Sequence, residues 1–181
     1  MIHVVDKAGR IIAQLTEGSE TAWYESRGYS IITGAEELAE ISEWRYEEGE
    51  LKPISDAERL ARAKAEKLAE LKQSVNAFVE RKPDGSVRYD TALKLNLVNA
   101  AIAGLAAGSG IPEKVQAVQQ WIAAVQGAYF ERKGAIEQAG SLAELEQVDV
   151  SYEWFEARYG AGGSQHPDPD VYASDLVLAG A

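Results

Sequence analysis

The chain has 181 residues, of which 46% are hydrophobic and 26% are charged, a composition that can bury a core and excludes a disordered protein. Its 18 basic and 29 acidic residues give a formal charge of −11, which repels nucleic-acid phosphates and anionic lipid head groups, so we expect neither as a partner. The lack of cysteine excludes disulfides, thiolate metal sites and cysteine nucleophiles. No apolar run approaches the roughly 20 residues of a membrane span, and the N-terminus lacks the pattern of a signal peptide. We therefore expect a protein that is made in the cytoplasm and is not inserted in a membrane.

The first part of the chain is predicted to combine short strands with one short helix. The expected strands cover residues 3–5, 10–15, 29–33, 43–46 and 50–53. Gly9 can take the positive φ that the first turn needs, and Ser19 is the expected cap of a helix over residues 20–26. In the last hairpin, alternation places Trp44 and Tyr46 on one face. The result is a small, curled sheet filled with aromatic side chains.

The chain after Pro53 is predicted to be mainly helical. Ser55 and Glu58 form a capping box at the start of the first long helix. Asp90 is the expected cap of the second helix, Pro112 opens the third, and Ser141 begins a second capping box. The expected helices cover residues 56–80, 91–107, 112–139, 142–147 and 151–159.

The helix over residues 91–107 is apolar on two sides. One stripe consists of Leu93, Leu97, Ala100 and Gly104. The other stripe consists of Leu95, Val98, Ile102 and Leu105. Because a helix with two apolar sides usually packs between neighbours, we expect both stripes to be covered.

The composition changes again after Gly160. Residues 161–170 are rich in Gly, Pro and Asp and resemble a linker, and a small apolar terminus follows. We expect this tail to be held against a neighbouring surface, and its deletion from Gly162 onward to weaken assembly while the helices stay folded. The predicted fold class is α+β, with a small N-terminal β-rich module, a mainly α-helical domain and an extended C-terminal tail. The expected boundaries are 1–53, 54–160 and 161–181.

Catalytic motifs are absent from the sequence. His3 and His166 lie at opposite ends of the chain without metal-ligand spacing, and no Gly-x-Ser-x-Gly elbow occurs. The glycine run at 160–163 follows a helix and leads to prolines, which is typical of a linker and not of a phosphate loop. Carboxylates are plentiful on predicted solvent faces, and a pair of them in a cleft stays open as a possibility. We expect no enzyme activity, no cofactor and no metal site.

The aromatic residues are the main candidates for contacts with a partner. Core filling is their commoner role, but neighbours such as Tyr129 and Phe130 cannot all face inward from one helix. Some of them are therefore expected to reach another protein. The candidate contact residues are Trp44, Tyr46, Tyr129, Phe130, Trp154, Phe155, Val171, Tyr172, Leu176 and Leu178.

Several segments of the helical region resemble one family. They are KLAELK at 67–72, YD at 89–90, LNLVNAA at 95–101, VQQW at 118–121, YFER at 129–132 and AIEQAGSLAELEQVD at 135–149. Together they resemble the helical domain of unknown function that occurs in tail-associated and tail-fibre-assembly proteins of bacteriophages and prophages. The hairpin with Trp44, Tyr46 and Gly49 is similar to the N-terminal parts of such proteins. The resemblance spans residues 55–149, and the family usually ends soon after that point.

The resemblance implies a phage tail context without enzyme activity or cofactor. The implied partners are other tail proteins of the fibre or baseplate, with a further copy of the chain as a possibility, and the implied location is the virion tail. Two roles in that context stay open, a structural or accessory piece and a fibre-assembly chaperone that is not retained in the particle. From another class, a tail-borne glycan hydrolase that uses paired carboxylates also stays open.

Overall fold

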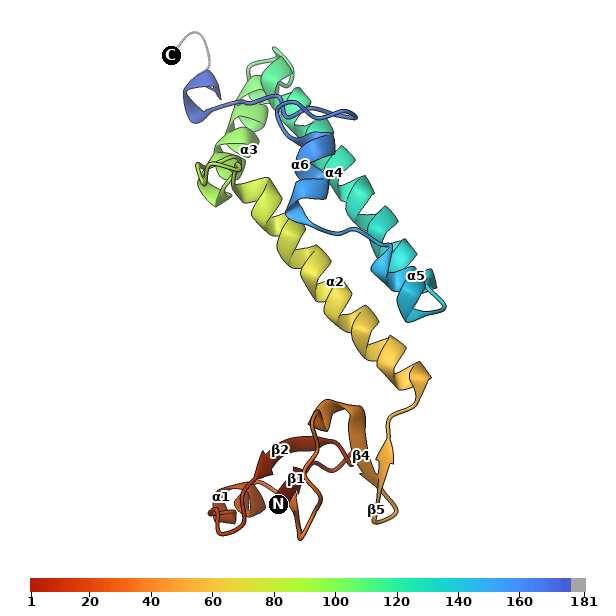
Figure 1. The fold of residues 1–181 in the computed structure, drawn as a ribbon. Helices are drawn as coiled ribbons and strands as arrows, with labels where there is room; N and C mark the ends of the chain where they lie inside the picture. Colours follow the sequence, from red (N-terminus) through yellow and green to blue (C-terminus); the bar gives the residue numbers. More distant parts are fainter. Residues whose placement is uncertain (177–181) are drawn as a thin grey trace. The chain divides into compact units, whose positions relative to one another are not determined.

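The computed structural model describes residues 1–176 and confirms the α+β class, with a small β-rich region followed by a mainly helical region (Figure 1). The chain divides into two compact units, Met1–Arg62 and Ala63–Ala181. The boundary lies inside the first long helix and not at Pro53, and residues 161–176 belong to the second unit.

The first unit contains a three-stranded antiparallel sheet in the order β2-β1-β3. Its strands are β1 (Ile2–Val5), β2 (Ile11–Leu15) and β3 (Ser30–Thr33), and β1 is buried along its whole length between the other two. The short helix α1 (Ala22–Ser26) begins after Thr21, which makes no side-chain cap hydrogen bond. The prediction that Ser19 caps this helix is therefore wrong.

A separate hairpin packs against the sheet. It consists of β4 (Trp44–Glu47) and β5 (Glu50–Pro53) and follows the 3₁₀ turn η1 (Ile41–Glu43). The two strands are antiparallel and pair Trp44 with Pro53. The amide of Tyr46 donates to the carbonyl oxygen of Gly9 at 2.8 Å, and the Tyr46 hydroxyl lies 3.3 Å from Nδ1 of the fully buried His3. The His3 ring also shares a hydrogen bond with Gln14, 3.0 Å away, so His3 joins sheet and hairpin as a structural residue.

The second unit is a set of helices around an aromatic core. The helices are α2 (Asp56–Glu80, shared with the first unit), α3 (Thr91–Ala106), α4 (Glu113–Gln138), α5 (Leu142–Glu146), α6 (Tyr152–Tyr159) and the 3₁₀ turn η2 (Ala173–Leu176). The predicted caps are present: Ser55 and Glu58 form the reciprocal box, and Asp90 accepts from the Leu93 amide at 2.8 Å. Trp121 is fully buried in the centre, where its indole N–H donates to the Tyr159 carbonyl at 2.7 Å.

We expect Gly9→Ala to destabilise the first unit more than Gly18→Ala. Both glycines have positive φ (79° and 87°), so an alanine costs about 1 kcal/mol of backbone strain at either site. A Cβ at Gly9 would also lie 2.1 Å from the Tyr46 carbonyl oxygen, whereas a Cβ at Gly18 would meet nothing within 4 Å. The clash should add ~1–3 kcal/mol at Gly9 alone.

Amide hydrogen exchange in β1 and β2 measures this difference, because these strands are hydrogen-bonded to each other in the unit that carries both glycines. Equal losses of protection in the two variants would show that the approach of Tyr46 to Gly9 does not constrain the fold.

Candidate functional site: a groove and an apolar helix face

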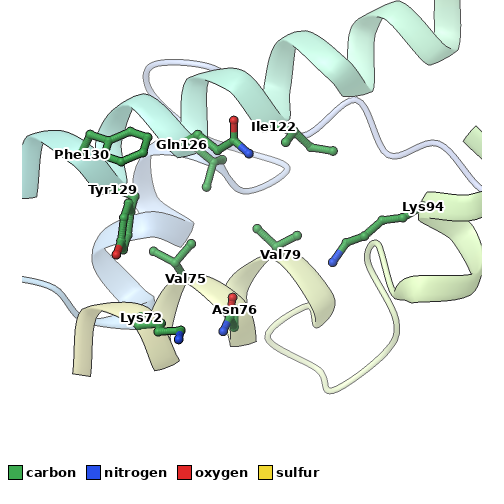
Figure 2. A pocket seen from close by; sticks show the side chains of 10 residues that line it. Lys72, Val75, Asn76, Val79, Lys94, Ile122, Gln126, Tyr129 and Phe130 are labelled. Carbon is green, nitrogen blue, oxygen red and sulfur yellow. The ribbon is translucent and has the colours of Figure 1, made fainter. Parts of the chain in front are cut away.

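A groove with a volume of about 560 Å³ lies between α2 and α4 (Figure 2). Its lining residues are Lys72, Val75, Asn76, Val79, Lys94, Ile122, Val125, Gln126, Tyr129 and Phe130. Val75 and Val79 point from α2 toward α4, and Ile122 lies across from them on α4 (Figure 2). These aliphatic side chains follow the helical spacing of three and four residues, so each helix presents an apolar edge to the groove.

Two adjacent aromatic residues of α4 stand at one end of the groove. Tyr129 and Phe130 are consecutive and so diverge by about 100° around the helix, with their ring centroids 5.3 Å apart and the rings at 74°. Tyr129 is half-buried, while Phe130 is 65% exposed. A large aromatic side chain thus stands in solvent beside an apolar groove.

The polar rim of the groove is basic or neutral. Lys72 and Lys94 contribute ammonium groups, and Asn76 and Gln126 contribute amides. The Nζ atom of Lys94 lies 3.7 Å from a carboxylate oxygen of Glu80, so this charge is partly balanced. None of the described residues that line the groove is acidic, although the whole chain has a net charge of −11. The rim therefore favours a partner segment with carboxylates over a basic one.

A second apolar surface lies on α3. Of its two stripes, the one with Leu93, Leu97 and Gly104 is buried against the rest of the unit. The other stripe is 53–60% exposed at each of its four positions, Leu95, Val98, Ile102 and Leu105. The expectation that both sides of this helix are covered is therefore wrong: in the described chain α3 packs on one side, against α4 and η2.

Three of the sequence-predicted contact residues are buried in the core, so their assignment to a partner surface is corrected. Phe155 is fully buried, with its ring centroid 5.8 Å from that of Phe78, and Val171 is also buried. Trp154 is covered by the guanidinium groups of Arg132 and Arg158, which lie 4.5 and 4.2 Å from the indole centroid. Adjacent aromatics can thus both be buried when arginine side chains cover the outer one.

A buried ion-pair network holds the C-terminal segment against the helices. The Arg88 side chain is 1% exposed and pairs with Glu156 of α6 (Nη2 to Oε2, 2.5 Å) and with Asp168 (Nε to Oδ2, 3.1 Å). Arg88 also donates to the Phe78 carbonyl at 2.7 Å, and the Tyr89 hydroxyl donates to Asp168 at 2.8 Å. Burial raises the pKa of Tyr89 above its usual range, so this hydroxyl stays a donor.

A second, more exposed contact follows along the same segment. The ammonium group of Lys82 donates to Asp170 and, at 2.7 Å, to the hydroxyl of Tyr172. The hydrogen bond to Asp170 raises the pKa of Lys82, and the same bond lowers the pKa of Asp170, so both groups stay charged. Because Asp168 belongs to the core, deletion from Gly162 onward would remove part of the fold and would not test partner binding alone.

The remaining candidates lie in different surroundings. Trp44 and Tyr46 are half-buried on the hairpin of the first unit, Tyr172 is exposed, and Leu176 is half-buried. Leu178 lies outside the described residues. The structure brings Tyr129 and Phe130 together at the groove. The aliphatic residues of the groove were not among the predicted contact residues, although helical spacing of apolar positions is the signal that could have found them.

Two hollows in the described part of the chain are lined by carboxylates. The one in the first unit lies beside Trp44 and Tyr46 and is lined by Glu36, Glu37, Glu40 and Glu43. The one in the second unit is lined by Glu153 and Glu156 together with Tyr152. Glu156 is engaged by Arg88 and lies 3.2 Å from the Tyr152 hydroxyl, whose pKa burial raises to about 12. Its position is thus explained by the ion-pair network, and the hydrolase alternative gains no support from it.

Within residues 1–176 no cluster of three or more His, Asp or Glu side chains could hold a metal ion. In the same part of the chain, no helix combines the length and the apolar character needed to cross a membrane. Comparison of the chain with protein-family models, with curated proteins and with solved structures found no match.

We expect Arg88→Met to lower the free energy of unfolding of the helical unit by ~3–5 kcal/mol, because it leaves the buried carboxylate of Asp168 and the partly exposed one of Glu156 without their cation. The matched control is Lys133→Met, which removes a cation from the solvent-exposed pair with Glu137 and should leave the stability nearly unchanged.

Urea unfolding followed by tryptophan fluorescence measures the stability of both variants. Trp23 and Trp44 are first replaced by Phe in each protein, so that the two remaining tryptophans report on the helical unit alone. Similar stability of the two variants would mean that the buried network does not hold the unit together.

Proposed function

We propose that this chain is a phage tail accessory or structural protein that acts through protein–protein contacts at the tail fibre or baseplate. The tail context rests on the resemblance of residues 55–149 to the helical domain of tail-associated proteins. The quoted segments supply structural residues of the helical unit, such as the helix cap Asp90 and the core residue Trp121. The proposal therefore assigns the binding role to surfaces and not to a catalytic group.

The exposed Phe130 beside the apolar groove is the observation that supports a binding role most directly. Aromatic side chains that fill or flank apolar pockets are the usual anchors of protein interfaces. Val75, Val79 and Ile122 offer such an apolar floor, and it lies open within the described part of the chain. The partner that fits is a segment of a tail protein with aliphatic or aromatic side chains and a carboxylate near Lys72.

We expect Phe130→Glu to reduce co-purification of tail proteins by at least ~10-fold, since loss of an aromatic anchor costs about 2 kcal/mol or more. The matched control is Leu142→Glu, which adds the same charge at an exposed position of α5 outside the groove and should bind as the wild type does. The measurement is a quantitative pull-down from cells that express the chain together with its neighbouring genes.

Two outcomes of the pull-down would contradict the proposal. Capture of no tail protein by the wild type would reject the tail function. Equal capture by both glutamate variants would reject the groove as the contact surface.

Mass spectrometry of purified particles then separates the two roles within the tail context. A structural or accessory protein is retained in the particle, whereas a fibre-assembly chaperone is missing from it although it binds a tail protein in the cell.

A further inference from the structure

The exposed stripe on α3 has a regular geometry. Leu95, Val98, Ile102 and Leu105 follow one another at steps of three, four and three residues, which is the spacing of the seam in paired helices. At about 1.5 Å per residue the stripe is ~15 Å long, or nearly three turns. The opposite side of the same helix is buried, so the stripe is presented on a helix that the core holds in place.

The order of these steps is the same from either end of the stripe. A second copy that runs antiparallel therefore places Leu95 opposite Leu105 and Val98 opposite Ile102, and the same pairs form again on the other side of a two-fold axis. An isologous dimer requires such a self-complementary pattern, in which residue i contacts j and j contacts i.

Charge also favours a second copy at this face. The chain carries a net charge of −11, so most contacts between two copies would bring carboxylates together, whereas α3 has no acidic residue and a single charged one, Lys94. An antiparallel pair places Lys94 of each copy opposite Ala106 of the other. A parallel pair would bring the two lysines side by side, which is unfavourable.

We propose that the α3 stripe binds the same stripe of a second copy of this chain, antiparallel about a two-fold axis. The dimer would cover eight aliphatic side chains that are each more than half exposed in the single chain. With four apolar side chains from each copy the interface is small, so we expect a reversible dimer with a dissociation constant on the order of micromolar, as for weak, transient interfaces. The inference goes beyond the tail function and does not depend on it, because none of the four stripe residues lines the groove, and only the flanking Lys94 borders both surfaces.

Introduced cysteines test the contact and its direction, since the chain has no thiol of its own. In the variant with both Leu95→Cys and Leu105→Cys we expect disulfide-linked dimers under a mild redox buffer. Leu95→Cys alone should give none, because the two Cα atoms would be ~15 Å apart, beyond the ~7 Å limit for a disulfide. Efficient cross-linking of Leu95→Cys alone, or none with the double variant, would overturn the antiparallel dimer.

Sedimentation equilibrium tests the same contact without cysteines. Val98→Glu together with Ile102→Glu should raise the dissociation constant at least ~100-fold, because like charges then meet across the axis. Val98→Glu together with Ile102→Lys should still dimerise, since the antiparallel register pairs each Glu with a Lys. Circular dichroism checks that both variants keep their helices, and Phe130→Glu serves as the control that leaves the dimer intact.

A wild-type chain that stays monomeric at concentrations well above the micromolar range would overturn the proposal. A second result would also overturn it: a monomeric chain in which the amides of the stripe are protected from hydrogen exchange only after another tail protein is added. The stripe would then bind that protein and not a second copy. Neither result bears on the pull-down with Phe130→Glu, so failure of the dimer and failure of the tail function are separate outcomes.

Discussion

The buried guanidinium of Arg88 is the constraint on which the helical unit depends. A charge that is 1% exposed costs several kcal/mol unless it is balanced, and Arg88 is balanced from two directions, by Glu156 on α6 and by Asp168 on the segment after it. The planar group also lies over the Phe78 ring, 4.2 Å from its centroid, and donates to the Phe78 carbonyl. One side chain thus ties together the end of α2, the helix α6 and the C-terminal segment.

This constraint decides which surfaces are used inside the molecule and which stay open. Asp168 and Asp170 of the C-terminal segment bind Arg88, Tyr89 and Lys82. The segment is therefore part of the folded unit. The turn η2 at its end packs against α3 and α4. The apolar surfaces left over are the groove between α2 and α4 and the outer face of α3, which together account for most of the large exposed apolar side chains of the helical unit.

The two open surfaces differ in chemistry and therefore in the occupant that we propose for each. The groove combines an aromatic anchor, an aliphatic floor and a lysine rim, and such an asymmetric set of groups suits a different protein. The α3 face is aliphatic, nearly uncharged and symmetric in its spacing, which suits a copy of itself. If both proposals hold, a dimer presents two grooves to the proposed tail partner, and binding at both strengthens attachment without any new contact.

The sequence by itself determined the local structure. Asp90 caps α3, Ser55 and Glu58 form their box, and the hairpin pairs Trp44 with Pro53, because each of these contacts joins residues close along the chain. The spacing of apolar residues also marked both stripes of α3 correctly as stripes. The expected cap at Ser19 failed, since a capping residue type does not specify where a five-residue helix begins.

Only the tertiary structure decided which of these features face the interior. Tyr89 and Asp168 are 79 positions apart in the sequence, and their hydrogen bond forms only when the helices of the unit are packed. A local sequence pattern cannot predict such a contact. The same packing buries Trp154 under two arginine side chains and leaves Leu95 and Ile102 exposed, although their residue types predict burial for all three. Local hydrogen bonds and periodicity specify the elements of this protein, whereas the choice of open surfaces follows from long-range packing around a buried charge.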